Sequence, residues 1–326
     1  MAVSFQCTNN PGRLLGAALA MVICIQVATL AQEHPRLLFS SSDIPALRAK
    51  MSSEPFASIA RAIQAEAESS SETSVDYNRG SRAVNAAFTY ILTGDVAWAN
   101  KAAALCDSVI RGGNWAKSSV KGLTLFMNGK NVALAYDFCY PALSQAVRDT
   151  LSAQIKANAD VCYLNGGTEQ NTNPASNWQG NRYAAAGISY LATDAAYTAA
   201  NLDGCYTKVV TYCRENMGSA ATSRGWNIEG IGYTTYPWGN FMGPFGMAMQ
   251  RANGAKDLRK EMTSVMWTPW TVFANGCRIR NGDRYGLHPD FGDDNPGLGG
   301  EGVYGQAFWY CPDALIPGLK YWYDRM

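Results

Sequence analysis

Apolar residues recur at helical spacing over most of the chain, and this periodicity limits the fold more than any other feature. Val84, Ala87, Phe88 and Ile91 follow the i, i+3, i+4, i+7 pattern of one apolar helix face. The same spacing resumes after Gly94 and predicts further helices near 97–111, 119–139, 144–163, 178–192, 203–216, 239–253 and 257–274. The alternation typical of strands is nearly absent before residue 275. The sequence therefore predicts an all-α fold.

Two distant stretches of the chain resemble each other. Residues 90–110 and 190–210 place Tyr, Thr, Asp and Ala in similar positions. A repeated helical hairpin explains this likeness, because each hairpin buries its apolar stripe against the next one. Stacked hairpins of this kind form an incomplete (α/α) toroid. An up-down bundle is the alternative, although so many helices of modest length argue against it.

The first 31 residues have the pattern of a signal peptide. Arg13 precedes the apolar run LLGAALAMVICIQVATLA, and Thr29 and Ala31 supply the small residues of a cleavage site before Gln32. A membrane anchor is the competing interpretation, but the run is at the short end for a span. We therefore expect a secreted or periplasmic protein, with no membrane contact once the signal peptide is cleaved.

The mature chain, 32–326, is expected to be one toroid domain with an atypical region at each end. In the N-terminal extension, 32–80, Pro45 follows Ser42-Asp43 and predicts a short helix through Lys50. The segment 275–326 is rich in Gly, Asp and Pro, which predicts loops with short strands. Its aromatic ending, GLKYWYDRM, suggests a chain that is cut short, although a docked terminal helix would end in the same way.

Charge and cysteine usage exclude several classes of function. The formal net charge is +1 and no basic tract occurs, so nucleic-acid binding has no electrostatic support. The chain has nine cysteines and two histidines but no C-x-x-C pair, so no metal site and no cofactor are predicted. Seven cysteines follow the signal peptide. We expect several of them to be small buried groups, and any disulfide pairing cannot be deduced.

The segment 224–254 contains the densest group of side chains suited to chemistry on a sugar. A glycine-rich loop carries Trp226, Glu229, Tyr233, Tyr236 and Trp238. Aromatic faces suit the apolar side of a sugar ring, and active sites commonly lie on loops held by helices. The alternative is a connecting loop whose aromatic side chains fill the core.

The polar loop 165–176 leads into a second candidate region. Ser176 or Asn177 is expected to cap the following helix, but Asn177 could instead donate its amide to a substrate carboxylate. Arg182, one turn later, could bind a carboxylate through two parallel hydrogen bonds or form a surface ion pair. Near the C-terminus, His288 is a candidate base or a loop histidine beside a proline. Arg280 could contact an anionic glycan or lie in a solvated turn.

Four segments, taken in order, resemble a known group of enzymes. They are HPRLLFSSSDIPALRAKM, NVALAYDFCYPALSQAVRDTL, SNWQGNRYAAAGISYLA and EGIGYTTYPW, within residues 34–254. As an ordered set they resemble the heparinase II/III-like and alginate-lyase-like polysaccharide lyases. The resemblance implies an incomplete helical toroid, followed in these families by a β-sandwich that has no counterpart in this sequence. It also implies cleavage of uronate-containing polysaccharides by β-elimination.

The resemblance assigns roles to individual residues. Asn177 matches the asparagine that neutralises the substrate carboxylate, whereas Trp178 stands where the families commonly have histidine. Glu229 begins the matching Glu-Gly-x-x-Tyr-x-x-Tyr segment, so Tyr233 or Tyr236 is expected to be the catalytic base and acid. Because Trp178 replaces the histidine, His288 is the candidate to take that residue's place.

The sequence thus predicts a polysaccharide lyase that acts on an anionic polysaccharide without a cofactor. The expected catalytic residues are Tyr233, Tyr236, Asn177 and His288, and the expected substrate-binding residues are Trp178, Arg182, Trp226, Glu229, Trp238 and Arg280. One alternative is a helical glycoside hydrolase, which needs Glu229 to face Asp290 or Asp293 across a cleft. Another is a glycan-binding toroid that has lost its activity.

Overall fold

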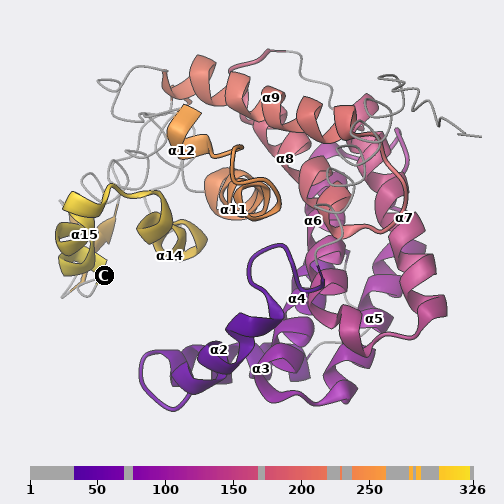
Figure 1. The fold of residues 1–326 in the computed structure, drawn as a ribbon, viewed down its shortest axis with the longest axis horizontal. Helices are drawn as coiled ribbons and strands as arrows, with labels where there is room; N and C mark the ends of the chain where they lie inside the picture. The colour runs from indigo at the N-terminus through magenta and orange to yellow at the C-terminus, as the bar shows by residue number, and fades with distance from the viewer. Residues whose placement is uncertain are drawn as a thin grey trace, which may run out of the picture. The chain divides into compact units, whose positions relative to one another are not determined.

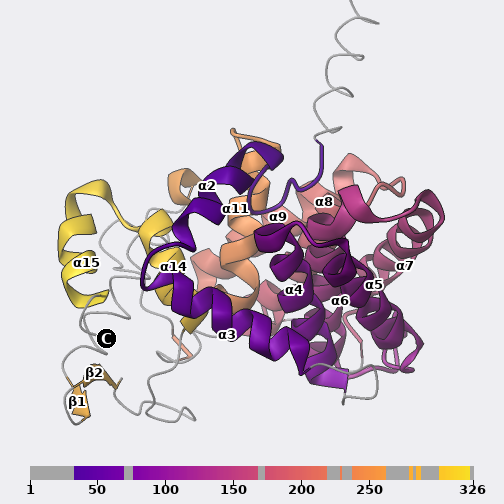
Figure 2. The same ribbon diagram turned by 90° about the horizontal axis from the view of Figure 1, so that it is seen from below.

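The computed structural model describes residues 33–69, 76–167, 173–218, 228–229, 237–261, 279–281, 284–287 and 301–323 (Figure 1). These residues are mainly helical, and the two strands among them are β1 (Ile279–Asn281) and β2 (Arg284–Leu287), which pair antiparallel (Figure 2). The prediction of an all-α fold is therefore confirmed. The predicted signal peptide lies outside the described residues.

Helices and helical turns follow one another along the chain. In order they are η1 (Ser41–Asp43), α2 (Ile44–Lys50), α3 (Phe56–Glu68), α4 (Asp76–Thr93), α5 (Val96–Arg111), α6 (Gly122–Cys139), η2 (Tyr140–Ala142), α7 (Gln145–Leu164), α8 (Asn177–Ala192), α9 (Ala199–Met217), η3 (Trp238–Met242), α11 (Gly243–Ala252), α12 (Leu258–Glu261), α14 (Glu301–Tyr310), η5 (Asp313–Leu315) and α15 (Ile316–Tyr323). Within this set η3 is a short π-helix.

Helices α4 to α9 form three consecutive hairpins: α4 with α5, α6 with α7, and α8 with α9. The second helix of each hairpin begins at a polar cap, because Asp95, Ser144 and Thr198 each accept a hydrogen bond from a backbone N–H of the first turn. The similar stretches 90–110 and 190–210 span the turns of the first and third hairpins. They are therefore equivalent hairpins, as the sequence predicts.

The first helices of the three hairpins, α4, α6 and α8, lie side by side (Figure 1). Near their ends, the ring of Phe88 in α4 packs against Phe138 in α6 at a centroid distance of 6.1 Å. Near their starts, the ring of Phe126 in α6 packs against Trp178 in α8, also at 6.1 Å. Corresponding ends meet, so α4, α6 and α8 run parallel. The second helix of each hairpin, α5, α7 or α9, runs back in the opposite direction.

Helix α6 is buried around almost its whole circumference because it contacts α4, α5, α7 and α8. Helix α8 also packs closely against α11, where Gly187 lies under the ring of Phe245. Helix α14 docks on the start of α11, where the Tyr310 hydroxyl donates to the carbonyl oxygen of Gly243 at 3.0 Å. One hydrophobic core joins these elements.

Several elements differ from the sequence-based expectations. Helix α3 was not predicted, and α4 begins at Asp76, before the apolar pattern that starts at Val84. Helices α14 and α15 form within the region expected to contain loops and short strands, although β1 and β2 fit that expectation. Glycines interrupt α14 and weaken its intrinsic helix propensity, so burial of Ala307 and Tyr310 must stabilise it. In α15 Leu319 is fully buried.

Six cysteines lie buried and unpaired in the described residues: Cys106, Cys139, Cys162, Cys205, Cys213 and Cys311. Burial raises the pKa of the Cys106 thiol to about 12, because a thiolate would lose its hydration there. These cysteines therefore act as small apolar groups, as expected. In the same part of the chain, none of the helices combines the length and apolar character that crossing a membrane requires.

Candidate functional site

Asn177 is the first residue of α8, and Ser176 is its N-cap. The Ser176 hydroxyl accepts a hydrogen bond from the backbone N–H of Trp178 at 3.4 Å. Ser176 thus provides the cap that the sequence left open between these two residues. The side chain of Asn177 is therefore available for other contacts, although it is only 5% exposed.

Glu229 holds Asn177 from a position 52 residues later in the chain. Its carboxylate accepts the backbone N–H of Asn177 and the Asn177 side-chain amide, each at 2.9 Å. The same carboxylate accepts the side-chain amide of Asn216 in α9 at 3.1 Å. Glu229 therefore places a negative charge at the N-terminus of α8, where the helix dipole favours it. These contacts join the loop at 228–229 to the start of α8.

Asn181, one turn along α8, completes this group of side chains. Its amide donates to the Asn177 side-chain oxygen at 3.1 Å, while its own oxygen is buried with no partner among the described residues. We call Asn177, Asn181, Asn216 and Glu229 the asparagine–glutamate cluster. An asparagine amide carries two hydrogens, and Glu229 takes one from Asn177. Among the described residues, no acceptor takes the second hydrogen of the Asn177 amide.

Lys130 of α6 is a site candidate that the sequence analysis missed. Its side chain is 7% exposed, and its ammonium lies 5.7 Å from the centre of the Phe241 ring in η3. Burial lowers the pKa of Lys130 to about 8, from an ordinary value near 10.5. No carboxylate lies within ion-pair distance of it in the described part of the chain. The available signal was a lysine between Asn128 and Asn131 in the otherwise largely apolar stretch LFMNGKNVALAY.

The two described tryptophans of the predicted site contribute mainly to packing. Trp178 is half-buried, and it packs on Phe126 and over Gly122, which fixes the start of α8 against α6. Trp238 is 1% exposed. Its ring and that of Tyr310 pack in a T-shaped arrangement with their centroids 4.9 Å apart. Because its faces are covered, Trp238 does not offer a platform for a sugar in this conformation.

Arg182 has a role that differs from both of the expected alternatives. Its guanidinium donates to the carbonyl oxygens of Cys162 and Tyr163, at the C-terminal end of α7, and stacks at 4.8 Å over the Tyr183 ring. Cations at a helix C-terminus satisfy carbonyls that have no partner within the helix. Arg182 thus joins α8 to the end of α7.

The remaining predicted site residues fall wholly or partly beyond what the structure describes. Trp226, Tyr233, Tyr236 and His288 lie outside the described residues. The backbone of Arg280 pairs with Tyr285 in the β1–β2 hairpin, and its side chain is outside what is described. Whether these side chains approach Asn177 stays a prediction.

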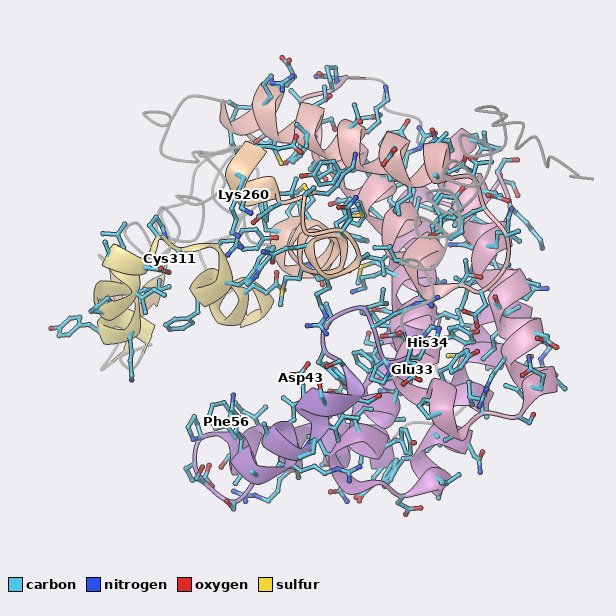
Figure 3. All side chains as sticks on the ribbon, in the orientation of Figure 1. Glu33, His34, Asp43, Phe56, Lys260 and Cys311 are labelled. Carbon is cyan, nitrogen blue, oxygen red and sulfur yellow. The ribbon has the colours of Figure 1, made fainter. Side chains whose placement is uncertain are left out.

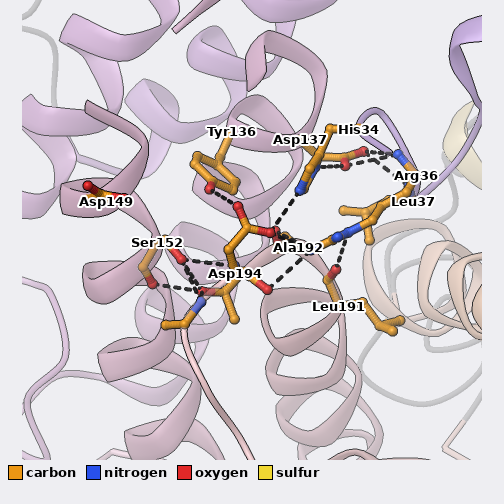
Figure 4. A network of polar contacts seen from close by, with 12 residues as sticks. His34, Arg36, Leu37, Tyr136, Asp137, Asp149, Ser152, Leu191, Ala192 and Asp194 are labelled. Carbon is orange, nitrogen blue, oxygen red and sulfur yellow. Dashed lines mark hydrogen bonds and ion pairs between the residues drawn. The ribbon is translucent and has the colours of Figure 1, made fainter. Parts of the chain in front are cut away.

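A second polar network lies around His34 and was also missed from the sequence (Figure 4). His34 Nδ1 contacts the Asp137 carboxylate at 2.7 Å, and its Nε2 contacts Asp194 at 3.3 Å. The imidazole stacks on Tyr140 with a centroid distance of 3.9 Å. Tyr136 donates its hydroxyl to Asp194 at 3.0 Å. Figure 3 shows His34 on the segment that precedes α2.

This His34 network is a structural clamp rather than part of the candidate site. Burial disfavours ionisation of Asp194, but hydrogen bonding and charge from His34 outweigh burial and lower the pKa of Asp194. Burial and the Asp194 charge raise the pKa of Tyr136 well above its usual range. The network holds the end of α8, and Asn177 lies at its start. At 1.5 Å per residue, the two sites are separated by about 22 Å.

Comparisons with known proteins add no relative. No protein-family model and no curated protein matches the chain. In the described residues, no group of three or more His, Cys, Asp or Glu side chains could hold a metal ion. The functional interpretation therefore rests on the four lyase-like sequence segments and on the geometry around Asn177.

Proposed function

We propose that this protein is a polysaccharide lyase that cleaves a uronate-containing glycan by β-elimination. One observation carries the proposal: Glu229 fixes Asn177 through two hydrogen bonds, which joins two of the four lyase-like segments. The parallel α4, α6 and α8 with returning α5, α7 and α9 also fit an incomplete (α/α) toroid, which we propose as the full arrangement. The leader-like residues 1–31 support export to where such glycans occur.

The chemistry requires charge stabilisation beside the sugar. Removing the C5 proton of a uronate places negative charge on the carboxylate and the adjacent carbon. A fixed N–H donor such as the second amide hydrogen of Asn177 stabilises this charge as it develops, because the donor needs no reorientation. Glu229 acts as a positioning residue in this scheme, since it holds the amide in place.

A tyrosine following Glu229 is the proposed proton-transfer group. Tyr233 is four residues from Glu229, which limits the distance between their Cα atoms to about 14 Å. As a phenolate, the tyrosine would accept the C5 proton. The C–H electron pair then forms the C4–C5 double bond, and the C4–O4 bond breaks. The same phenol would return its proton to the departing O4.

The test is a turnover assay on defined polysaccharides: alginate, heparan sulfate, hyaluronan and polyglucuronate. A lyase forms a C4–C5 double bond at each cleavage, so ultraviolet absorbance should rise with a cleavable substrate. Tyr233→Phe and Tyr236→Phe each remove one hydroxyl. The variant that lacks the catalytic hydroxyl should lose roughly 10²-fold or more in kcat, with little change in Tm.

Three results would contradict this proposal. Saturated reducing ends without new absorbance would indicate hydrolysis, and binding without cleavage would indicate a glycan-binding protein. Full activity in both tyrosine variants would remove tyrosine from the mechanism. His288→Gln would then test the next candidate base.

A further inference from the structure

Lys130 is a buried cation without a described counter-charge. The residues before and after it on α6 are buried, and most of them are apolar apart from Asn128 and Asn131 beside it. The cation has only the face of the Phe241 ring close by among the described contacts. A buried charge without a paired partner destabilises a fold, and such groups concentrate at functional sites. The position of Lys130 therefore needs an explanation beyond packing.

The contacts of α6 place Lys130 where α6 faces α8 and η3. The residue before it, Gly129, lies opposite Ser189 of α8, because a Cβ added there would be 3.7 Å from the Ser189 hydroxyl. Nearer the starts of the two helices, Phe126 of α6 packs against Trp178 of α8. The Cα–Cβ bond of a helical residue is tilted toward the helix N-terminus. The Lys130 side chain therefore leaves α6 in the direction of the Phe126–Trp178 contact and of the cluster at the start of α8.

The π-helix η3 contacts both Lys130 on α6 and Gly180 on α8. Phe241 lies by the Lys130 ammonium, and the next residue, Met242, packs closely over Gly180, which precedes Asn181. Phe241 and Met242 therefore cover adjacent parts of α6 and α8. Several buried groups in this region lack hydrogen-bond partners among the described residues: the Asn181 and Asn216 side-chain oxygens, the Asn128 amide and the Asn131 side-chain nitrogen. The described contact of the Lys130 ammonium is with the Phe241 ring.

We infer that Lys130 binds an acidic group of the glycan, the carboxylate of a uronate, next to the position served by Asn177. The ammonium supplies the positive charge, and the Asn181 oxygen can accept a hydrogen bond from a sugar hydroxyl. This inference rests on the proposed function and gives its site a specificity-determining residue. The cation would favour acidic glycans over neutral ones of the same shape.

A binding experiment with uncleavable sugars tests this role directly. Methyl glycosides of D-glucuronate and D-mannuronate carry no sugar on O4, so β-elimination cannot break a chain, and methyl glucoside is the neutral counterpart. Isothermal titration of the full chain should show binding of at least one methyl uronide in preference to methyl glucoside. Lys130→Met should weaken uronide binding at least tenfold. Lys117→Met, which removes a charge from an exposed site, should bind like the wild type.

A stability measurement separates a lost binding group from a damaged fold. Lys130→Met removes a buried charge but keeps an unbranched side chain, so its Tm without sugar should be equal to or above that of the wild type. If its Tm falls instead, Lys130→Gln, which stays polar but is uncharged, should lose the same preference for uronides. Loss of binding with an intact Tm supports a ligand role.

The inference is overturned if the uncharged Lys130 variants bind methyl uronides as tightly as the wild type. It is also overturned if the wild type does not prefer uronides to methyl glucoside. The outcome is separable from that of the proposed function. Lys130-dependent binding with no cleavage of any polymer would refute the lyase activity and keep the binding site. Cleavage of a polymer by Lys130→Met with an unchanged KM would refute the role of Lys130 in binding and keep the lyase activity.

Discussion

Single side chains determine how the candidate site is organised, and Glu229 is the clearest case. Its carboxylate accepts from two groups of Asn177 and one of Asn216, so three donors depend on one side chain. The sequence analysis expects Glu229 to bind substrate. The structure shows that its carboxylate instead holds Asn177 and Asn216 and lies at the start of α8.

We expect Glu229→Gln to destabilise the protein although it preserves size. The amide replaces one acceptor oxygen with a donor, which must then face an N–H of Asn177 or Asn216. A buried donor left without an acceptor costs about 1–3 kcal/mol, so the free energy of unfolding in urea should fall by that amount. Glu215→Gln is the control, because Glu215 is exposed on α9. Equal stability of both variants would show that the Glu229 contacts contribute little.

At the scale of elements, close approach between helices explains glycines that weaken them locally. Gly187 lies in the interior of α8, where glycine is less favourable than alanine. A Cβ added there would lie 2.2 Å from the Phe245 ring of α11. The packing of α8 on α11 therefore requires this glycine, whereas its helix propensity alone would favour alanine.

Two glycine variants test whether helix propensity or overpacking has the larger effect on stability. Alanine gains about 1 kcal/mol of helix propensity over glycine. Overpacking costs typically about 1–3 kcal/mol, and a contact of only 2.2 Å between the added Cβ and the Phe245 ring lies at the upper end. Gly187→Ala should therefore lower the free energy of unfolding by about 1–2 kcal/mol in chemical denaturation. Gly254→Ala is the matched control, because nothing lies within 4 Å of an added Cβ there, and it should be neutral. A stabilising Gly187→Ala would mean that α11 moves easily away from α8.

At the scale of the whole molecule, the His34 clamp joins residues distant in the sequence. Asp137 of α6 is fully buried and accepts the backbone N–H groups of Arg36 and Leu37 as well as contacting His34. The Arg36 side chain donates onward to the carbonyl oxygens of Leu191 and Ala192 at the end of α8. The N-terminal segment is thereby held against two parallel helices.

Asp137→Asn should destabilise the clamp and leave the candidate site intact. An asparagine amide cannot accept the hydrogen bonds that the second carboxylate oxygen accepts, and a buried donor loses its partner. We expect a loss of about 2–4 kcal/mol in denaturation, with faster hydrogen exchange at Arg36 and Leu37. Asp149→Asn, at an exposed position of α7, is the control. Uronide binding should persist, because the clamp is at the far end of α8; its loss in a folded variant would link the two sites.

The sequence by itself determined the helical class, the hairpin repeat and most helix positions between 84 and 252. These features follow from local periodicity and capping, which are written in neighbouring residues. It also singled out Asn177 and Glu229, because their residue types in short motifs resemble those of the lyases. Helix α14 escaped prediction because glycines lower its propensity and burial stabilises it. Helix α3 is rich in helix-forming residues and buries only Ala60 and Ala67, so local pattern could have predicted it.

Only the tertiary structure decided the partners of those residues. Contacts between segments far apart in the chain determine three of these outcomes. Glu229 meets Asn177, Arg182 caps α7, and Trp238 lies in the core. The burial of Lys130 likewise depends on the helices that pack around α6 and on Phe241 of η3. Such contacts are set by the packing of whole elements. A local pattern predicts which face of a helix is apolar, but it does not predict which neighbouring element covers that face.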